Sequence, residues 1–117
     1  MLGEKVPVAA LVARYGGDEF VVILPGADLV RAGQTAETLR EAIGSAVFFD
    51  PETVHDQTPT PLPRVTASIG ISSYRDHLAP GGSQRRREST LLRLADSAMY
   101  RAKASGRNRV EIAEPED

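Results

Sequence analysis

Two adjacent carboxylates, Asp18 and Glu19, directly follow two adjacent glycines, and this pattern is the one in the chain that best suits chemistry. The four residues lie in the run Arg14-Tyr15-Gly16-Gly17-Asp18-Glu19-Phe20. Gly16 and Gly17 permit a tight turn and leave no Cβ in the path of a ligand. Carboxylate oxygens are the ligands that a hard cation prefers. The run therefore predicts an acidic turn that suits nucleoside triphosphate chemistry.

The sequence on both sides of this run predicts the two strands of a hairpin. Residues 11–15 form the first strand, and residues 20–24 form a second one that is apolar throughout and ends at Pro25 and Gly26. A continuously apolar strand is typical of one buried on both faces. The elements that must position the two acids are therefore a pair of short strands.

A helix is expected to follow the hairpin. Asp28 is a suitable N-cap, and apolar residues recur at helical spacing from Leu29 to Ile43, before Gly44. We expect Gly44 to terminate this helix. The pattern leaves charged residues on the solvent side, namely Arg31, Glu37, Arg40 and Glu41.

Two loops and a strand make up the middle of the chain. Residues 50–63 contain four prolines and predict a loop. An edge hairpin is the alternative for this segment. Apolar residues alternate with small and polar ones from Val65 to Ile71, which predicts a strand with two unlike faces. Residues 74–88 predict a second loop, in which Arg85 to Arg87 are expected to be solvated.

The last part of the chain predicts a helix and a short strand. Ser89 or Thr90 is expected to cap the helix, and Gly106 is suitably placed as its left-handed C-cap. Residues 109–113 predict the final strand. The expected core stripe of the helix consists of Leu91, Leu94, Ala95, Ala98 and Ala102.

Three segments together resemble the GGDEF domain family, the diguanylate cyclases that join two GTP molecules into cyclic di-GMP. The run at residues 14–20 matches the family signature, Val65 to Ile71 resembles its following strand, and residues 95–108 resemble its last helix and exit. Order and spacing agree over residues 11–113. The resemblance implies an α+β fold, a palm-like, antiparallel-rich sheet covered by helices, of the nucleotidyl cyclase and ferredoxin-like kind.

The resemblance also implies that the family's first β-α portion is missing. That portion carries a metal-binding Asp and the side chains that read guanine, whereas residues 1–10 contain no acid except Glu4. We expect residues 1–117 to be a single, N-terminally truncated domain with a frayed tail at 114–117. The missing strand would lie in the middle of the sheet. Residues 5–10, a strand exchanged with a second copy, or an upstream segment could fill the gap, and the sequence does not choose among them.

The same resemblance gives roles to six residues. Asp18 is the expected catalytic metal ligand for Mg²⁺ or Mn²⁺ and helps activate the ribose 3′-hydroxyl, with Glu19 in a secondary role; the family's upstream Asp is missing. Gly16 and Gly17 contact the substrate. The expected triphosphate ligands, Lys103 and Arg107, lie four apart and so on one helix face. There are two plainer alternatives. The signature could be an ordinary exposed turn, and the two cationic side chains could only complement the dipole at the end of a helix.

The implied reaction is the condensation of two GTP molecules into cyclic di-GMP with release of pyrophosphate. Each GTP would be held by one domain, so catalysis needs a homodimer. An upstream sensory or receiver domain is expected but is not seen, and activity of this chain alone stays open. The family's product-inhibition motif, Arg-x-x-Asp, would fall at Pro7 to Ala10, where neither charge is present. We therefore expect no product-inhibition site.

Two other functions stay open. The chain could be a degenerate or truncated GGDEF module that binds nucleotide or a protein partner without catalysis. It could also be an unrelated palm-like nucleotidyl transferase, which would require all three matches to arise by chance.

Composition excludes several classes of protein. A net charge of −2 over 117 residues argues against a dedicated nucleic-acid binder. The absence of cysteine excludes disulfides, thiolate catalysis and Cys-based zinc sites, and it suits a cytoplasmic protein. No apolar run approaches the roughly 20 residues that span a bilayer. His55 and His77 are expected to be solvated surface residues.

Overall fold

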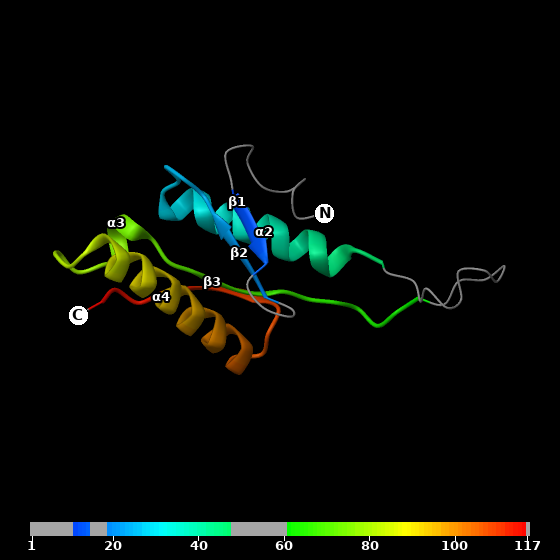
Figure 1. Cartoon of the computed structure of the whole chain (residues 1–117). Helices are drawn as coiled ribbons and strands as arrows, with labels where there is room; N and C mark the ends of the chain where they lie inside the picture. Colours follow the sequence, from blue (N-terminus) through cyan, green and yellow to red (C-terminus); the bar gives the residue numbers. More distant parts are fainter. Residues whose placement is uncertain (1–10, 15–18, 48–60, 117) are drawn as a thin grey trace.

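The computed structural model describes residues 11–14, 19–47 and 61–116, which form an α+β arrangement of short strands and longer helices (Figure 1). The elements follow in the order β1 (Leu11–Arg14), β2 (Phe20–Ile23), α2 (Leu29–Ser45), β3 (Ser68–Ile71), α3 (Tyr74–His77), α4 (Gln84–Ala104) and β4 (Arg109–Ile112). None of the helices formed by the described residues is long and apolar enough to cross a membrane.

The strands form two separate pairs. β1 and β2 are antiparallel, with Arg14 opposite Phe20, which confirms the predicted hairpin. The prediction that the second strand is buried is wrong at both of its ends, because Phe20 and Ile23 are exposed. β3 and β4 are parallel, with Ser68 opposite Arg109. Within the described part of the chain, no ladder joins the two pairs. The gap in the sheet that the resemblance implies stays a prediction. Residues 5–10, one of the proposed ways to fill it, lie outside the described residues, and the other two remain open.

Helix α2 begins as predicted and ends later than predicted. The Asp28 carboxylate accepts a hydrogen bond from the Arg31 N–H at 2.8 Å, which confirms the N-cap. Ala36 and Leu39 are the buried residues of its apolar face. The prediction that Gly44 ends the helix is wrong, because the helix continues to Ser45 and is capped by Ala46 in an extended conformation.

Strand β3 lies between the two long helices and contacts both (Figure 1). A Cβ built on Gly70 would lie 2.1 Å from the Ala95 carbonyl oxygen, so this face of the strand rests directly on the backbone of α4. Ile71, on the opposite face, is buried. The strand is shorter than predicted because β4 begins opposite Ser68, which leaves Val65 to Ala67 without a partner in that strand.

The main apolar cluster lies beneath α4. Leu94, Ala98 and Ala113 form it, and Leu78 packs against it. Ala98 and Ala102 are fully buried, as expected for the predicted core stripe. Small side chains on this face allow the helix and strand backbones to approach closely.

The predicted loop at residues 74–88 is wrong in two respects. Its first residues form the short helix α3, which the Ser73 side chain caps. Its last residues already belong to α4, because Ser83 caps that helix by accepting from the Arg86 N–H at 3.2 Å. The cap is therefore neither Ser89 nor Thr90. A Ser-x-x-Arg start lacks the acid of a capping box, which explains why the sequence pattern did not reveal it.

Arg87 is not a solvated loop residue. Its Nη1 donates to the carbonyl oxygens of Ala79 and Gly81 at 2.6 and 2.9 Å. Its Nε donates to the Tyr74 hydroxyl at 3.0 Å, and the guanidinium lies 4.9 Å from the centre of that ring. Arg87 thus fastens α3 and the segment after it to the first turns of α4.

His77 and the C-terminal segment also differ from expectation. His77 is 4% exposed, and its Nδ1 accepts a hydrogen bond from the Ser73 N–H at 2.9 Å, so it is a buried structural residue. The predicted frayed tail is wrong for Glu116, whose N–H donates to the His77 carbonyl at 2.7 Å. The Glu116 carboxylate accepts from the Ala79 N–H at 3.0 Å. His55 and Asp117 lie outside the described residues.

Candidate functional site

The acidic run falls between the two strands of the hairpin. The register pairs Arg14 with Phe20, the residues on either side of it. Glu19 is half-buried and directly precedes β2. Gly16, Gly17 and Asp18 lie outside the described residues, so their roles stay predictions. What the structure establishes here is a pair of strands that brings both ends of the run together.

The two predicted phosphate ligands lie where α4 gives way to β4. Lys103 is half-buried in the last turn of the helix, and Arg107 is exposed beyond its end. The prediction that Lys103 and Arg107 lie on one helix face is wrong, because α4 ends at Ala104 and Arg107 has a φ of 63°. The spacing of four residues therefore spans a helix end and a turn.

The turn after α4 has an unusual backbone. Gly106, Arg107 and Asn108 all have positive φ, at 120°, 63° and 47°. The Arg107 N–H donates to the Ala102 carbonyl at 2.9 Å, which is the long hydrogen bond of a Schellman motif. The predicted left-handed C-cap at Gly106 is confirmed. The left-handed conformation extends over two further residues, one of which is a predicted phosphate ligand.

A side chain from α2 reaches this turn. Arg40 Nη1 donates to Asn108 Oδ1 at 2.9 Å. Arg40 also pairs with the carboxylate of Glu37, one helical turn earlier. The hydrogen bond to Glu37 raises the pKa of Arg40 above its ordinary value, although partial burial acts in the opposite direction. The expectation that Arg40 faces only solvent is wrong, and helical periodicity could not reveal a contact made across 68 residues of sequence.

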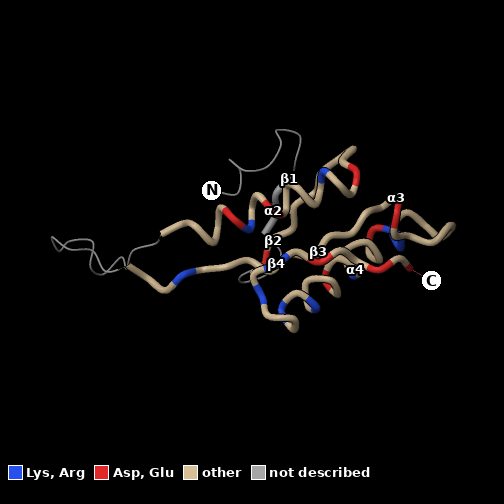
Figure 2. The backbone as a smooth tube through the Cα atoms, turned by 180° about the vertical axis from the view of Figure 1, so that it is seen from behind, with Lys and Arg blue, Asp and Glu red and all other residues tan. Residues whose placement is uncertain are grey.

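Positive charge gathers around the same turn. Figure 2 shows Lys and Arg positions at the end of α4 and the start of β4, where the sequence has Arg101, Lys103, Arg107 and Arg109. Arg101 Nη2 donates a hydrogen bond to the Ile112 carbonyl at 2.8 Å. Arg107 and Arg109 are exposed. This part of the surface can attract an anion such as a phosphate.

The described residues do not assemble a metal site by themselves. No group of three or more His, Asp or Glu side chains gathers among them. Nor does any hydrogen bond or ion pair in the described part of the chain join Glu19 to Lys103 or Arg107. A cation site at Glu19 would need Asp18 and at least one further ligand, and a carboxylate pair is a suitable donor set for Mg²⁺ or Mn²⁺.

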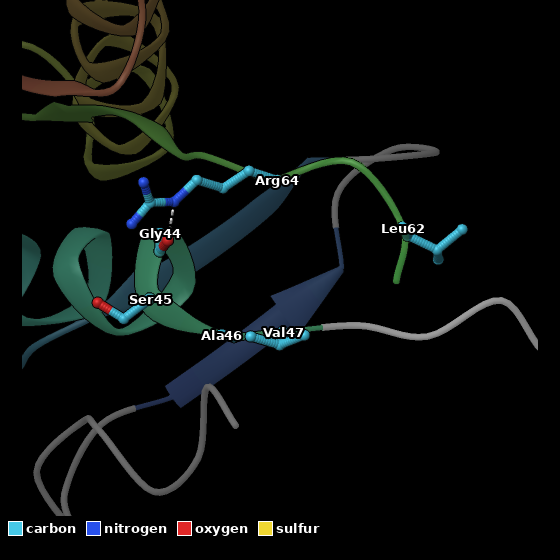
Figure 3. A pocket seen from close by; sticks show the side chains of 6 residues that line it. All are labelled: Gly44, Ser45, Ala46, Val47, Leu62 and Arg64. Carbon is cyan, nitrogen blue, oxygen red and sulfur yellow. Dashed lines mark hydrogen bonds between the residues drawn. The ribbon is translucent and has the colours of Figure 1, made fainter. Parts of the chain in front are cut away.

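A hollow of about 270 Å³ lies at the C-terminal end of α2 (Figure 3). The Arg64 Nε donates to the Gly44 carbonyl at 2.6 Å across it, and the Leu62 side chain points away. The described residues that line it include no acid and no histidine: Gly44, Ser45, Ala46, Val47, Leu62 and Arg64. We assign it no catalytic role.

Comparison with known proteins identifies relatives for almost the whole chain. A family model described as "Diguanylate cyclase, GGDEF domain" matches residues 1–109. The chain is 36% identical to diguanylate cyclase DgcP of Pseudomonas aeruginosa over 113 residues, which are 96% of this chain and 14% of that protein. It is 38% identical to the response regulator PleD of Caulobacter vibrioides over 109 residues, 93% of this chain and 21% of that protein.

Solved structures agree with the sequence relatives. The GGDEF domain of DgcB from Caulobacter crescentus, in complex with c-di-GMP, matches with a TM-score of 0.75 and 28% identity, over 95% of this chain and 57% of that one. The GGDEF domain of YfiN from Pseudomonas aeruginosa matches with a TM-score of 0.72 and 30% identity, over 98% and 63%. These matches confirm the predicted palm-like α+β fold. The chain spans less than two thirds of each of these relatives.

Proposed function

The chain belongs to the GGDEF family, and from this premise we propose that it is a diguanylate cyclase domain. The proposed reaction condenses two GTP molecules into cyclic di-GMP and pyrophosphate. The 3′-hydroxyl of one GTP attacks the α-phosphate of the other, which requires two domains to face each other as a homodimer. Residues 1–117 act as one domain in this proposal.

One observation carries the proposal. The signature residues are intact and lie between Arg14 and Phe20, which the hairpin register holds opposite each other. Relatives matched over nearly the whole chain carry the name diguanylate cyclase, and one solved relative binds c-di-GMP. A module that only binds nucleotide or a partner is not favoured, because relatives matched over nearly the whole chain are named diguanylate cyclases.

We assign the proposed roles as follows. Asp18, helped by Glu19, holds Mg²⁺ or Mn²⁺. When bound, the cation would neutralise charge on the phosphates and lower the pKa of the attacking hydroxyl. Gly16 and Gly17 let the backbone approach the substrate. Lys103 and Arg107 bind the triphosphate. Control by a sensory or receiver domain stays a prediction.

The test is a turnover assay with the purified chain, GTP and either cation, read out as cyclic di-GMP by chromatography and mass spectrometry. Asp18→Ala should lower the rate at least about 100-fold, because a metal ligand contributes several kcal/mol of transition-state stabilisation. Asp96→Ala, which removes an exposed acid from α4, is the matched control and should leave the rate unchanged.

Dimerisation has its own readout in the same assay. The rate per chain should rise with chain concentration and then level off, because two copies must meet for each product formed. A folded chain that makes no cyclic di-GMP at any concentration would contradict the proposal. So would an Asp18→Ala chain as active as Asp96→Ala.

A further inference from the structure

The turn between α4 and β4 holds Arg107 in a conformation that it would seldom adopt alone. Its φ of 63° lies in the left-handed region, which residues other than glycine and asparagine rarely populate. Asn108, with a φ of 47°, continues the same conformation and tolerates it better. Surrounding contacts must stabilise such a backbone if it is to persist.

Two hydrogen bonds stabilise this turn. The Arg107 N–H donates to the Ala102 carbonyl within the Schellman motif. Arg40 donates to the Asn108 side chain from the neighbouring helix α2. The Arg40 side chain is only 21% exposed, and it pairs with Glu37 through Nε and Nη2 while Nη1 donates to Asn108. A planar guanidinium that already pairs with one carboxylate can fix the position of an amide oxygen that accepts from its remaining nitrogen.

We propose that Arg40 is a positioning residue that holds the left-handed turn through Asn108 and thereby directs Arg107 at the triphosphate. Arg40 does not touch the substrate in this scheme. The part that concerns the triphosphate rests on the proposed function, and the part that concerns the turn does not. The effect of Arg40 on nucleotide affinity therefore passes through Arg107.

The first experiment measures binding of GTP with Mg²⁺ to the full chain by calorimetry. Arg40→Ala should weaken GTP about five- to tenfold, a coupling typical of side chains within one hydrogen-bond network. Binding of GMP, which lacks the outer phosphates, should change less than about twofold by the same additivity argument. Arg40→Lys keeps the charge without the fork and should recover part of the loss. Arg31→Ala, an exposed arginine on the same helix, is the matched control and should bind like the unsubstituted chain.

A double-mutant cycle separates positioning from a general structural role. In a chain that already carries Arg107→Ala, adding Arg40→Ala should not weaken GTP further. A further loss as large as in the unsubstituted chain, or an equal loss for GMP, would overturn the proposal. Asn108→Gly removes the other partner while tolerating the positive φ of this position, and it replaces Arg40→Ala if that variant does not fold.

The second experiment needs no nucleotide. Amide hydrogen exchange at Arg107, measured by NMR, should be at least about tenfold faster in Arg40→Ala than in Arg31→Ala, because the turn opens more often. Unchanged exchange would overturn the role of Arg40 in the turn. Failure of the unsubstituted chain to bind GTP would overturn the proposed function and the triphosphate part, while faster exchange would still support the hold on the turn.

Discussion

Replacing Gly70 by alanine tests the close contact between β3 and α4. A Cβ at this position would lie 2.1 Å from the Ala95 carbonyl oxygen and 2.4 Å from the Met99 nitrogen, where ordinary contact begins near 3.4 Å. Both neighbours are backbone atoms of a helix, so no side-chain rotation can relieve the clash. The helix would have to move away from the strand by about 1 Å, which opens the packing around Ala98.

We expect Gly70→Ala to lower the free energy of unfolding by about 3 kcal/mol, the upper part of the range for overpacked cores. The same change at Gly33, within α2, meets nothing within 4 Å. There, alanine should raise the free energy of unfolding by about 0.5–1 kcal/mol, because glycine is a poor residue for a helix interior. The two variants add the same methyl group and should differ in sign.

The assay is urea unfolding followed by circular dichroism, with free energies compared at an unchanged denaturant slope. A loss smaller than about 1 kcal/mol for Gly70→Ala would refute the close approach of β3 and α4, because a clash of this size exceeds what the core can absorb cheaply. A Gly70→Ala chain that fails to fold beside a folded Gly33→Ala chain is the extreme form of the expected result.

Two further predictions concern single side chains. Arg87→Lys should lower the free energy of unfolding by about 1–2 kcal/mol in the same assay, because a lysine cannot donate both to the two loop carbonyls, as Nη1 does, and to the Tyr74 hydroxyl, as Nε does. Arg86→Ala, at the exposed neighbour, should stay within about 0.5 kcal/mol. An equal effect of both changes would contradict the fastening role. Asp28→Ala should lower the free energy of unfolding by about 1 kcal/mol through loss of the N-cap. Asp28→Asn still accepts the hydrogen bond and should lower it by only about a few tenths of a kcal/mol. No difference between the two variants would argue against the cap.

Local patterns in the sequence predicted the elements well where neighbouring residues decide them. The hairpin, the start of α2 at Asp28 and the turn at Gly106 depend on alternation, capping and backbone freedom within a few residues, and all three are confirmed. The apolar stripe of α4 likewise follows from helical spacing, and Ala98 and Ala102 are buried as expected.

Predictions failed where a residue's partner comes from elsewhere in the fold. His77 was expected at the surface, yet it is buried, and its carbonyl oxygen accepts a hydrogen bond from the Glu116 N–H of the C-terminal segment. Arg87 was expected to be solvated, yet it binds carbonyls of the segment that precedes α4. In both cases the side chain is polar and its sequence neighbours are ordinary, so no local pattern marks it as structural.

The sequence by itself determined the family, the types of most elements and the identity of the candidate site residues, because each of these depends on residue type and short spacing. Only the tertiary structure decided that Arg107 lies beyond the helix in a left-handed turn and that Arg40 holds this turn through Asn108. The physical reason is that a charged residue on a helix surface occupies the same place in the sequence pattern whether its side chain contacts water or another element. Packing of α2 beside β4 makes that choice.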